Sequence, residues 1–146
     1  MSRKHSRTSI FLIEFTISLL LFSLATAVCV QLFVQSHQRS SESTRLSRSV
    51  VEAQNMAEIY RGCGGQIDET MKILKSEYPY METTNSTEAA AFYNKDFEHS
   101  QESDSYFMTK ISFNKTSEYS TMEIIITETE NGTEIYSLPV KMYIGE

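Results

Sequence analysis

The stretch "SIFLIEFTISLLLFSLATAVCVQLFV", residues 9–34, decides the fold of this chain of 146 residues. Ile10 to Val34 are 25 residues without Lys, Arg, Gly or Pro, and a helix needs about 20 apolar residues to cross a bilayer. The run therefore predicts a single transmembrane helix over residues 10–34. One carboxylate, Glu14, lies near its start. An acidic residue costs roughly 2.5–3.5 kcal/mol at the centre of a spanning helix and less near an end.

The charges on the two sides of this run differ in sign. Arg3, Lys4 and Arg7 precede it with no acid among them, so residues 1–9 are predicted to form a basic cytoplasmic leader. The whole chain carries a net charge of -6, but from Gly62 onward there are six Lys, no Arg and fifteen Asp or Glu. The predicted head is therefore acidic and extracytoplasmic, and it is expected to repel nucleic acid.

Two other interpretations of the apolar run stay open. "ATA" at residues 25–27 fits the small-residue pattern of a signal-peptidase site, which would release a secreted acidic domain after Ala27. The run continues past that point as "VCVQLFV", and a spanning helix explains its whole length. In the other alternative the chain is an uncleaved single-pass membrane protein whose head binds a partner, and Glu14 has no special role.

Helical periodicity continues beyond the apolar run. No Gly or Pro occurs between Val34 and Gly62, and an apolar stripe steps by four, three, four and three through Leu46, Val50, Ala53, Ala57 and Tyr60. Residues 35–61 are therefore predicted to continue the helix as an amphipathic segment, giving one helix of about 75 Å from residue 10 to residue 60. The alternative is a hinge at the Ser-rich "SSEST", followed by a separate helix.

Residues 62–146 are predicted to form the head. "RGCGGQ" ends the long helix, and "IDETMKILKSEYP" predicts a short helix with Ile67, Met71 and Leu74 on one face and Pro79 at its end. The polar stretch 82–105 is expected to be a surface loop. "YFMTKISFN", "TMEIIITETE" and "TEIYSLPVKMYI" predict three antiparallel strands, with a possible fourth; the "NG" at residues 131–132 marks a hairpin and Pro139 an edge strand or a bulge. The fold class is α+β, a long N-terminal helix packed against a small antiparallel meander.

No catalytic, cofactor or metal site is predicted. His5, His37 and His99 are spread over three different segments without metal-ligand spacing. Cys29 and Cys63 would lie about 50 Å apart on one helix and cannot form a disulfide with each other. The chain is expected not to be an enzyme.

The start of the apolar run resembles the amino terminus of type IV pilins and of type II secretion pseudopilins. That family carries a short basic leader, a motif "TLIE" and a long apolar helix; Leu12, Ile13 and Glu14 match "LIE". The resemblance implies cleavage by prepilin peptidase between Ser9 and Ile10, and methylation of the new amino terminus. The family usually has Gly and Phe at these two positions.

The resemblance also implies a bacterial structural subunit that assembles through its helix. It would be a minor pilin or pseudopilin of a type IV pilus, a type II secretion system or a competence apparatus. Its partners would be other pilin-like subunits, assembly-platform proteins, the membrane and, where the leader is cleaved, prepilin peptidase. Glu14 would pair with the amino terminus of a neighbouring subunit. Close approach of the helices would be allowed by four small residues, Ser18, Ser23, Ala25 and Ala27.

Overall fold

The computed structural model describes residues 3–145, with side chains from residue 9 onward. The basic side chains of the expected leader, Arg3, Lys4 and Arg7, lie outside the described side chains. The chain divides into two compact units, Met1–Ser43 and Thr44–Glu146, and each is described by itself. The first unit is helical throughout its described part and belongs to α1.

The α1 helix comprises Arg3–Gly62 and is helical without interruption through "SSEST". It is longer than the predicted helix, because it already includes leader residues from Arg3 onward. Its C-terminal end is placed by glycine: Gly64 and Gly65 have φ values of +60° and +76°, and the Gly65 amide donates to the Tyr60 carbonyl at 3.2 Å. Left-handed glycines close helices in this way because they have no Cβ atom to clash.

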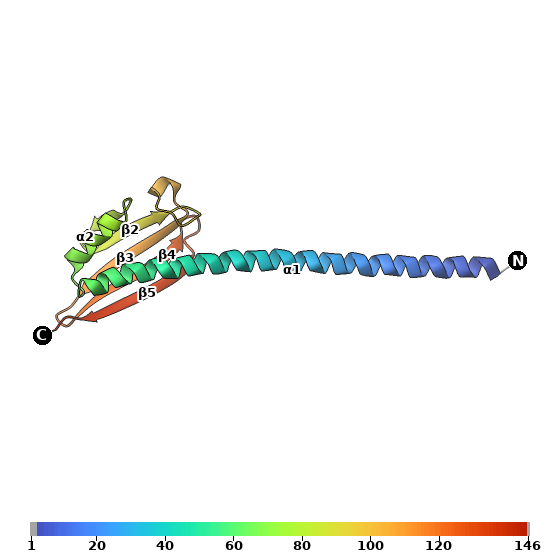
Figure 1. Ribbon diagram of the computed structural model, residues 1–146, viewed down its shortest axis with the longest axis horizontal. Helices are drawn as coiled ribbons and strands as arrows, with labels where there is room; N and C mark the ends of the chain where they lie inside the picture. The colour runs from blue at the N-terminus through green and yellow to red at the C-terminus, as the bar shows by residue number, and fades with distance from the viewer. Residues whose placement is uncertain (1–2, 146) are drawn as a thin grey trace. The chain divides into compact units, whose positions relative to one another are not determined.

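The second unit consists of the last turns of α1, a second helix and a five-stranded antiparallel sheet in the order β1-β2-β3-β4-β5 (Figure 1). The elements after α1 are α2 (Ile67–Glu77), β1 (Glu82–Asn85), β2 (Glu88–Tyr93), a 3-10 turn (Glu102–Asp104), β3 (Phe107–Lys115), β4 (Tyr119–Glu128) and β5 (Glu134–Tyr143). The predicted α+β class and the packing of the long helix on an antiparallel meander are confirmed.

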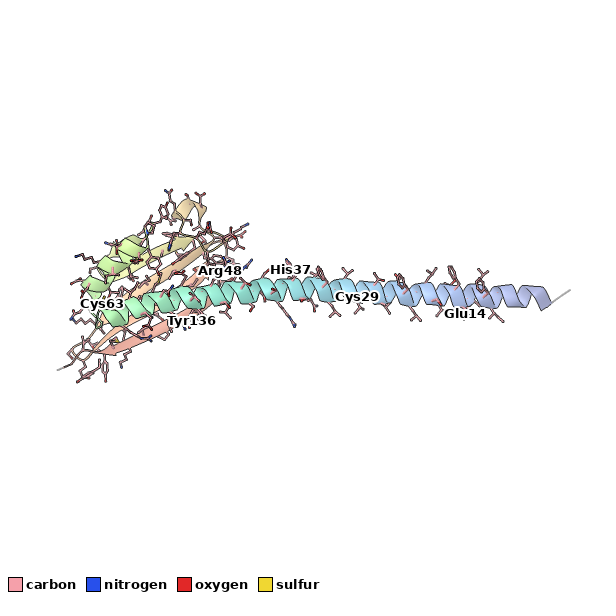
Figure 2. The ribbon with its side chains drawn as sticks, in the orientation of Figure 1. Glu14, Cys29, His37, Arg48, Cys63 and Tyr136 are labelled. Carbon is pink, nitrogen blue, oxygen red and sulfur yellow. The ribbon has the colours of Figure 1, made fainter. Side chains whose placement is uncertain are left out.

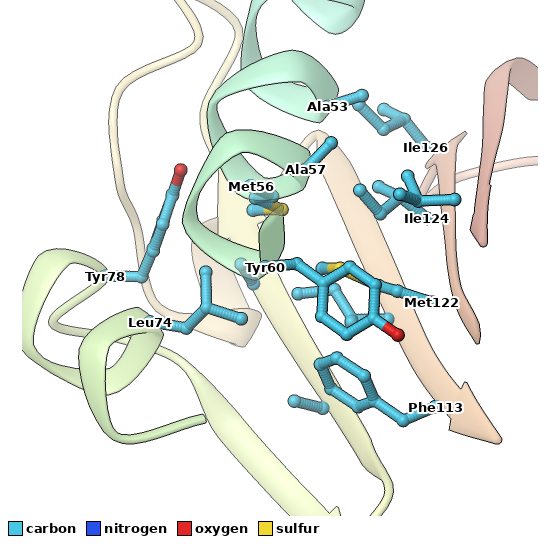
Figure 3. Packing of buried hydrophobic residues seen from close by; sticks show 14 of the residues in the cluster. Ala53, Met56, Ala57, Tyr60, Leu74, Tyr78, Phe113, Met122, Ile124 and Ile126 are labelled. Carbon is cyan, nitrogen blue, oxygen red and sulfur yellow. The ribbon is translucent and has the colours of Figure 1, made fainter. Parts of the chain in front are cut away.

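The core lies between the helices and one face of the sheet. From α1 it takes Ala53, Ala57 and Tyr60, three members of the predicted stripe, and these face Met122, Ile124 and Ile126 of β4 (Figure 3). The Tyr60 ring packs on the Phe113 ring of β3 with 5.9 Å between their centroids. On β3 the odd-numbered residues from Phe107 to Phe113 point inward.

The stripe differs from its prediction at its N-terminal end. Leu46 is 45% exposed and Val50 is half-buried, whereas Ser49 and Met56 are fully buried. Arg45, one residue before Leu46, is bonded to Glu128, the last residue of β4. Leu46 therefore lies at the end of the sheet, where no strand remains to cover it.

α2 covers the part of the sheet near β2 (Figure 1). Met71 and Leu74 are buried as predicted, Ile67 is half-buried, and Thr70 is buried as well. The helix ends at Glu77, and Tyr78 follows as its C-cap just before Pro79. Tyr78 is 6% exposed, so the residue that ends this helix also joins the core.

The prediction of a surface loop over 82–105 is wrong, because this stretch contains β1, β2 and the 3-10 turn. All four residues of β1 are exposed, so no apolar alternation marks it, and the alanines of β2 are weak strand formers. A tight turn connects the two strands. In this turn Asn85 Oδ1 accepts hydrogen bonds from the Thr87 amide at 2.8 Å and from the Thr87 hydroxyl at 2.9 Å. An Asn side chain that bonds the backbone two residues on favours a tight turn.

The predicted hairpin at "NG" is confirmed between β4 and β5. Gly132 has φ +68°, and its amide donates to the Glu128 carbonyl at 2.9 Å. β5 is an edge strand, as Pro139 predicted, and Pro139 pairs with Glu123 of β4.

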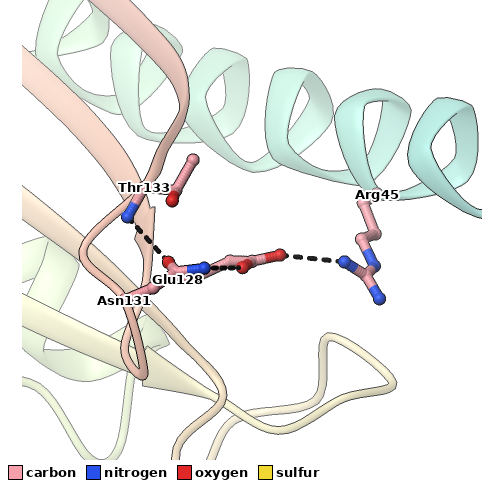
Figure 4. A network of polar contacts seen from close by, with 4 residues as sticks. All are labelled: Arg45, Glu128, Asn131 and Thr133. Carbon is pink, nitrogen blue, oxygen red and sulfur yellow. Dashed lines mark hydrogen bonds and ion pairs between the residues drawn. The ribbon is translucent and has the colours of Figure 1, made fainter.

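A polar network ties α1 to this hairpin (Figure 4). The Arg45 guanidinium donates to Glu128 Oε1 at 2.8 Å, and the Asn131 side-chain amide donates to Glu128 Oε2 at 2.9 Å. Asn131 Oδ1 in turn accepts from the Thr133 amide at 2.8 Å. One half-buried carboxylate thus fixes both the turn and the helix beside it.

Substitution of Gly65 tests the contact between the end of α1 and the ends of β4 and β5. A Cβ atom at Gly65 would lie 3.2 Å from Met142 Cβ and 3.4 Å from Ser120 Cβ, on a backbone with φ +76°. We expect Gly65→Ala to destabilise the head by about 1–3 kcal/mol, because the left-handed backbone and the contact both penalise a side chain. Urea unfolding of the detergent-solubilised chain, followed by circular dichroism, measures this change.

Gly62→Ala is the matched control for that experiment. Gly62 is the last residue of α1, and a Cβ atom there meets nothing within 4 Å. This substitution should leave stability unchanged or raise it slightly, since Ala is the better helix former. Equal losses in the two variants would contradict the packing of Gly65 against the ends of β4 and β5.

Candidate functional site on the apolar half of α1

The apolar half of α1 is a continuous hydrophobic surface. Every described residue from Ser9 to Val34 is exposed in the single chain, including large side chains such as Phe22 at 73% and Phe33 at 75%. The helix is long and apolar enough to cross a membrane. Soluble monomers rarely expose more than a few hundred Å² of contiguous apolar surface, so this segment is a candidate for cover by lipid or by other helices.

Three hydroxyls of this segment are bonded within the helix. The hydroxyls of Thr16, Ser18 and Thr26 donate to the carbonyls four residues earlier, at 2.7, 2.9 and 2.9 Å. These bonds remove the cost of burying three hydroxyls in lipid. Glu14 is different, because among the described residues no cation forms an ion pair with its carboxylate.

Glu14 lies one helical turn inside the apolar run, about 6 Å along the axis from Ile10. Figure 2 labels it on α1 together with Cys29 and His37. Leu12 and Ile13, the residues of the motif match, are 56% and 57% exposed. The bond between Ser9 and Ile10, where processing is predicted, lies inside α1, so its peptide groups are held in helical geometry.

The predicted small packing residues fall on two faces of the helix. At about 100° per residue, Ser18 and Ala25 lie within roughly 40° of Glu14 around the axis. Ser23 and Ala27 lie about 140–180° from Glu14, on the opposite side. Small side chains let neighbouring helices approach closely, so this distribution offers close approach on the face of Glu14 and on the face behind it.

The described side chains of the head form no arrangement that suggests catalysis. Among the described residues no group of three or more His, Cys, Asp or Glu side chains could hold a metal ion. His5 lies outside the described side chains. His37 is on the exposed part of α1, and His99 lies against aromatic rings in the head. The expectation of no enzyme activity stays a prediction.

Sequence reasoning did not find the buried tyrosine cluster formed by Tyr78, Tyr93, His99 and Glu52. The His99 ring lies edge-on to Tyr78 at 5.2 Å and beside Tyr93 at 5.3 Å, centroid to centroid. The Tyr78 hydroxyl donates to Glu52 Oε2 at 3.4 Å. Glu52 lies at the border of the apolar stripe of α1, and this position was the only sequence signal for the cluster.

The surroundings of the cluster shift the pKa values of Tyr78 and Tyr93. Burial, followed by the nearby charge of Glu52, raises the pKa of Tyr78 and of Tyr93 well above the ordinary value for tyrosine. The Tyr93 side chain is fully buried, and its hydroxyl has no hydrogen-bond partner among the described residues. Such a hydroxyl costs stability, because burial removes its bonds to water without replacing them.

Comparison of the chain with protein-family models, curated proteins and solved structures finds no match.

The raised tyrosine pKa values predict a loss of stability at alkaline pH. The unfolded chain loses its tyrosine protons near pH 10, whereas Tyr93 stays protonated in the folded head; stability is therefore full below about pH 10 and falls as pH rises above it. Tyr93→Phe should keep about 1 kcal/mol more stability than wild type at pH 11, because it removes one such proton. Urea unfolding at pH 8 and pH 11 measures the difference.

Tyr143→Phe is the control, because Tyr143 is 63% exposed. This variant should lose the same stability as wild type between the two pH values. At pH 8 Tyr93→Phe should be as stable as wild type or more so, since it deletes an unpartnered hydroxyl. An unchanged alkaline loss in Tyr93→Phe would contradict the burial of a protonated phenol at this position.

Proposed function

We propose that this chain is a structural subunit of a pilin-like assembly, a minor pilin or pseudopilin of a type IV pilus, type II secretion or competence apparatus. One observation carries the proposal: the Glu14 carboxylate, which forms no ion pair with any described side chain, lies one turn inside an exposed apolar helical segment. The same helix ends in a small antiparallel head. This combination fits a subunit that is completed by its neighbours.

The orientation follows from charge. The leader carries Arg3, Lys4 and Arg7, and the head is acidic, so the positive-inside rule favours a cytoplasmic amino terminus. The head then lies outside the cytoplasm, on the membrane surface or in a fibre.

The assembly step we propose is electrostatic. A carboxylate in a low-dielectric surrounding is stabilised by a cation at close range. Cleavage between Ser9 and Ile10 would create an α-amino group, and this group on a neighbouring subunit would pair with Glu14. Ser18 and Ala25 beside Glu14, with Ser23 and Ala27 behind it, would let each helix contact neighbours on both sides.

The alternatives differ in the amino terminus of the mature chain. Ser9 and Ile10 stand where the family usually has Gly and Phe, which favours an uncleaved membrane protein as the second candidate. Release of a secreted domain after Ala27 is less favoured, because the helix continues unbroken through this site.

Intact mass and amino-terminal sequencing of the protein from its native membrane distinguish these cases. We expect a start at Ile10 with a methylated amino group. A start at Met1 or Ser2 would contradict processing and leave an uncleaved anchor. A start at Val28 would overturn the proposal, because the mature protein would then lack Glu14.

The second test concerns Glu14 itself. We expect Glu14→Ala to insert into the membrane normally but to reduce incorporation into a high-mass assembly by about tenfold or more. The reason is that the α-amino group of the neighbouring subunit would be buried without its carboxylate partner. Sedimentation of the surface or membrane fraction, followed by immunoblotting, measures incorporation.

Thr16→Val is the matched control at nearly the same depth. Its hydroxyl is bonded to the Leu12 carbonyl, and it lies about 160° away from Glu14 around the helix. It should assemble like wild type. Wild-type incorporation of Glu14→Ala would overturn the role of Glu14 in assembly.

A further inference from the structure

The hairpin between β4 and β5 contains Asn131 followed by Gly132, and this pair has a chemistry of its own. The backbone nitrogen of the residue after an asparagine can attack the side-chain carbonyl carbon of that asparagine. Glycine leaves this approach open, because it carries no Cβ atom. Asn131 is exposed, and a Cβ atom at Gly132 would meet nothing within 4 Å, so no distant part of the described chain covers the pair.

Asn131 differs in this respect from the other asparagines of the chain. These are Asn55, Asn85, Asn94 and Asn114, and each is followed by Met, Ser or Lys. A side chain on the following residue obstructs the attack by its backbone nitrogen. The sequence therefore distinguishes Asn131 from every other asparagine as a site for this reaction.

The reaction converts the side-chain amide of Asn131 into a carboxylate. The Gly132 nitrogen forms a bond to Asn131 Cγ, and the bond from Cγ to Nδ2 breaks. Nδ2 leaves as ammonia together with the proton of the Gly132 nitrogen, and a cyclic imide remains. Water then adds to either carbonyl carbon of the imide and opens the ring, which gives aspartate or isoaspartate. Water is the only co-reactant.

In the folded head, hydrogen bonds engage all the groups that react (Figure 4). The Gly132 amide donates to the Glu128 carbonyl at 2.9 Å. Asn131 Oδ1 accepts from the Thr133 amide at 2.8 Å, and Asn131 Nδ2 donates to Glu128 Oε2 at 2.9 Å. The attack requires the Asn131 side chain to rotate toward the Gly132 nitrogen, and both side-chain bonds oppose this rotation.

Glu128 also connects this turn to α1. The Arg45 guanidinium donates to Glu128 Oε1 at 2.8 Å, while Asn131 is bonded to Oε2 of the same carboxylate. The Glu128 side chain is only 17% exposed, so few other orientations are open to it. One carboxylate therefore holds the helix and the asparagine at the same time.

We propose that Asn131 is a site of spontaneous deamidation and that the network of Arg45, Glu128 and Asn131 controls its rate. The reaction is slow in the closed hairpin and proceeds when the hairpin opens locally. Its product does not fit the closed network, because a carboxylate at position 131 cannot donate to Glu128 Oε2 and places a second negative charge beside it. Deamidation therefore loosens the contact between the hairpin and α1 irreversibly.

This inference is independent of the proposed function. All the residues that it uses belong to the compact unit Thr44–Glu146, and it needs no neighbouring subunit. Its failure would leave the role of Glu14 untouched, and normal assembly of Glu14→Ala would leave this inference untouched.

Peptide mapping of the detergent-solubilised full chain measures the reaction. The chain is incubated at pH 8 in native buffer or in guanidinium chloride and is then digested with trypsin. In the peptide of residues 116–141, Asn131 is the only asparagine, and mass spectrometry separates its amide form from its acid form. We expect the acid form to accumulate about tenfold or more slowly in the folded chain, because only the open hairpin reacts.

The peptides that contain Asn85 and Asn114 are internal controls, and in guanidinium chloride they should react much more slowly than Asn131. Absence of the acid form of Asn131 in the unfolded chain would overturn the site itself. Equal rates in the folded and the unfolded chain would overturn its control by the hairpin.

Substitution of the network residues tests that control directly. Arg45→Ala and Glu128→Gln should each raise the rate in the folded chain by about twofold to fivefold, the effect of a partly exposed ion pair on local opening. Arg61→Ala removes the ion pair with Glu58 instead and should react like wild type. A wild-type rate in both network variants would contradict the role of Arg45 and Glu128.

Asn131→Asp reproduces one product of the reaction. We expect hydrogen exchange at the Gly132 amide to be about twofold to fivefold faster in this variant, because the bond from position 131 to Glu128 is lost. Adding Glu128→Gln restores that bond with donor and acceptor exchanged, so the double variant should exchange more slowly than Asn131→Asp. Unchanged exchange in Asn131→Asp, or no recovery in the double variant, would contradict the loosening by the product.

Discussion

The head depends on the packing of one face of α1 against β4. Ser49, Ala53 and Ala57 recur at intervals of four, and all three are fully buried. Ala53 and Ala57 belong to one buried cluster with Ile124 and Ile126 of β4. A sheet with one apolar face needs such a cover, so the five strands owe their core to a helix that begins in another unit of the chain.

This packing is tight, yet it leaves polar groups inside it. The side-chain oxygens of Ser49, Tyr60, Tyr93, Thr109 and Ser120 are buried without a hydrogen-bond partner among the described residues. Each such group reduces the stabilisation that apolar burial gives. Hydrogen bonds at the border of the core offset part of this loss of stability. Arg45 donates to Glu128, and Arg48 donates to the Asp96 carbonyl. Both these hydrogen bonds and the apolar contacts of the core therefore fix the position of the helix on the sheet.

Sequence periodicity was enough to predict α1, α2 and the "NG" hairpin, because each depends on residues close together in the chain. It also identified Ala53, Ala57 and Tyr60 as core residues. It failed at Leu46, because burial there depends on where the sheet ends. It also failed at β1 and β2: β1 shows no apolar alternation and β2 begins with a run of alanines, and both strands depend on pairing with neighbours in the sheet. At the candidate site, periodicity places Ser18 and Ala25 beside Glu14. It cannot place a partner, since the partner belongs to another molecule.

The apolar surface of residues 10–34 is unfavourable in water, because every described residue in it is exposed in the single chain. Lipid can cover the apolar side chains, and under the proposed function a neighbouring subunit would supply the counter-charge for Glu14. A helix that is already formed has no nucleation cost when it packs against a neighbour. In that case α1 would serve two purposes, since its C-terminal end closes the core of the head and its N-terminal half carries Glu14, Ser18 and Ala25.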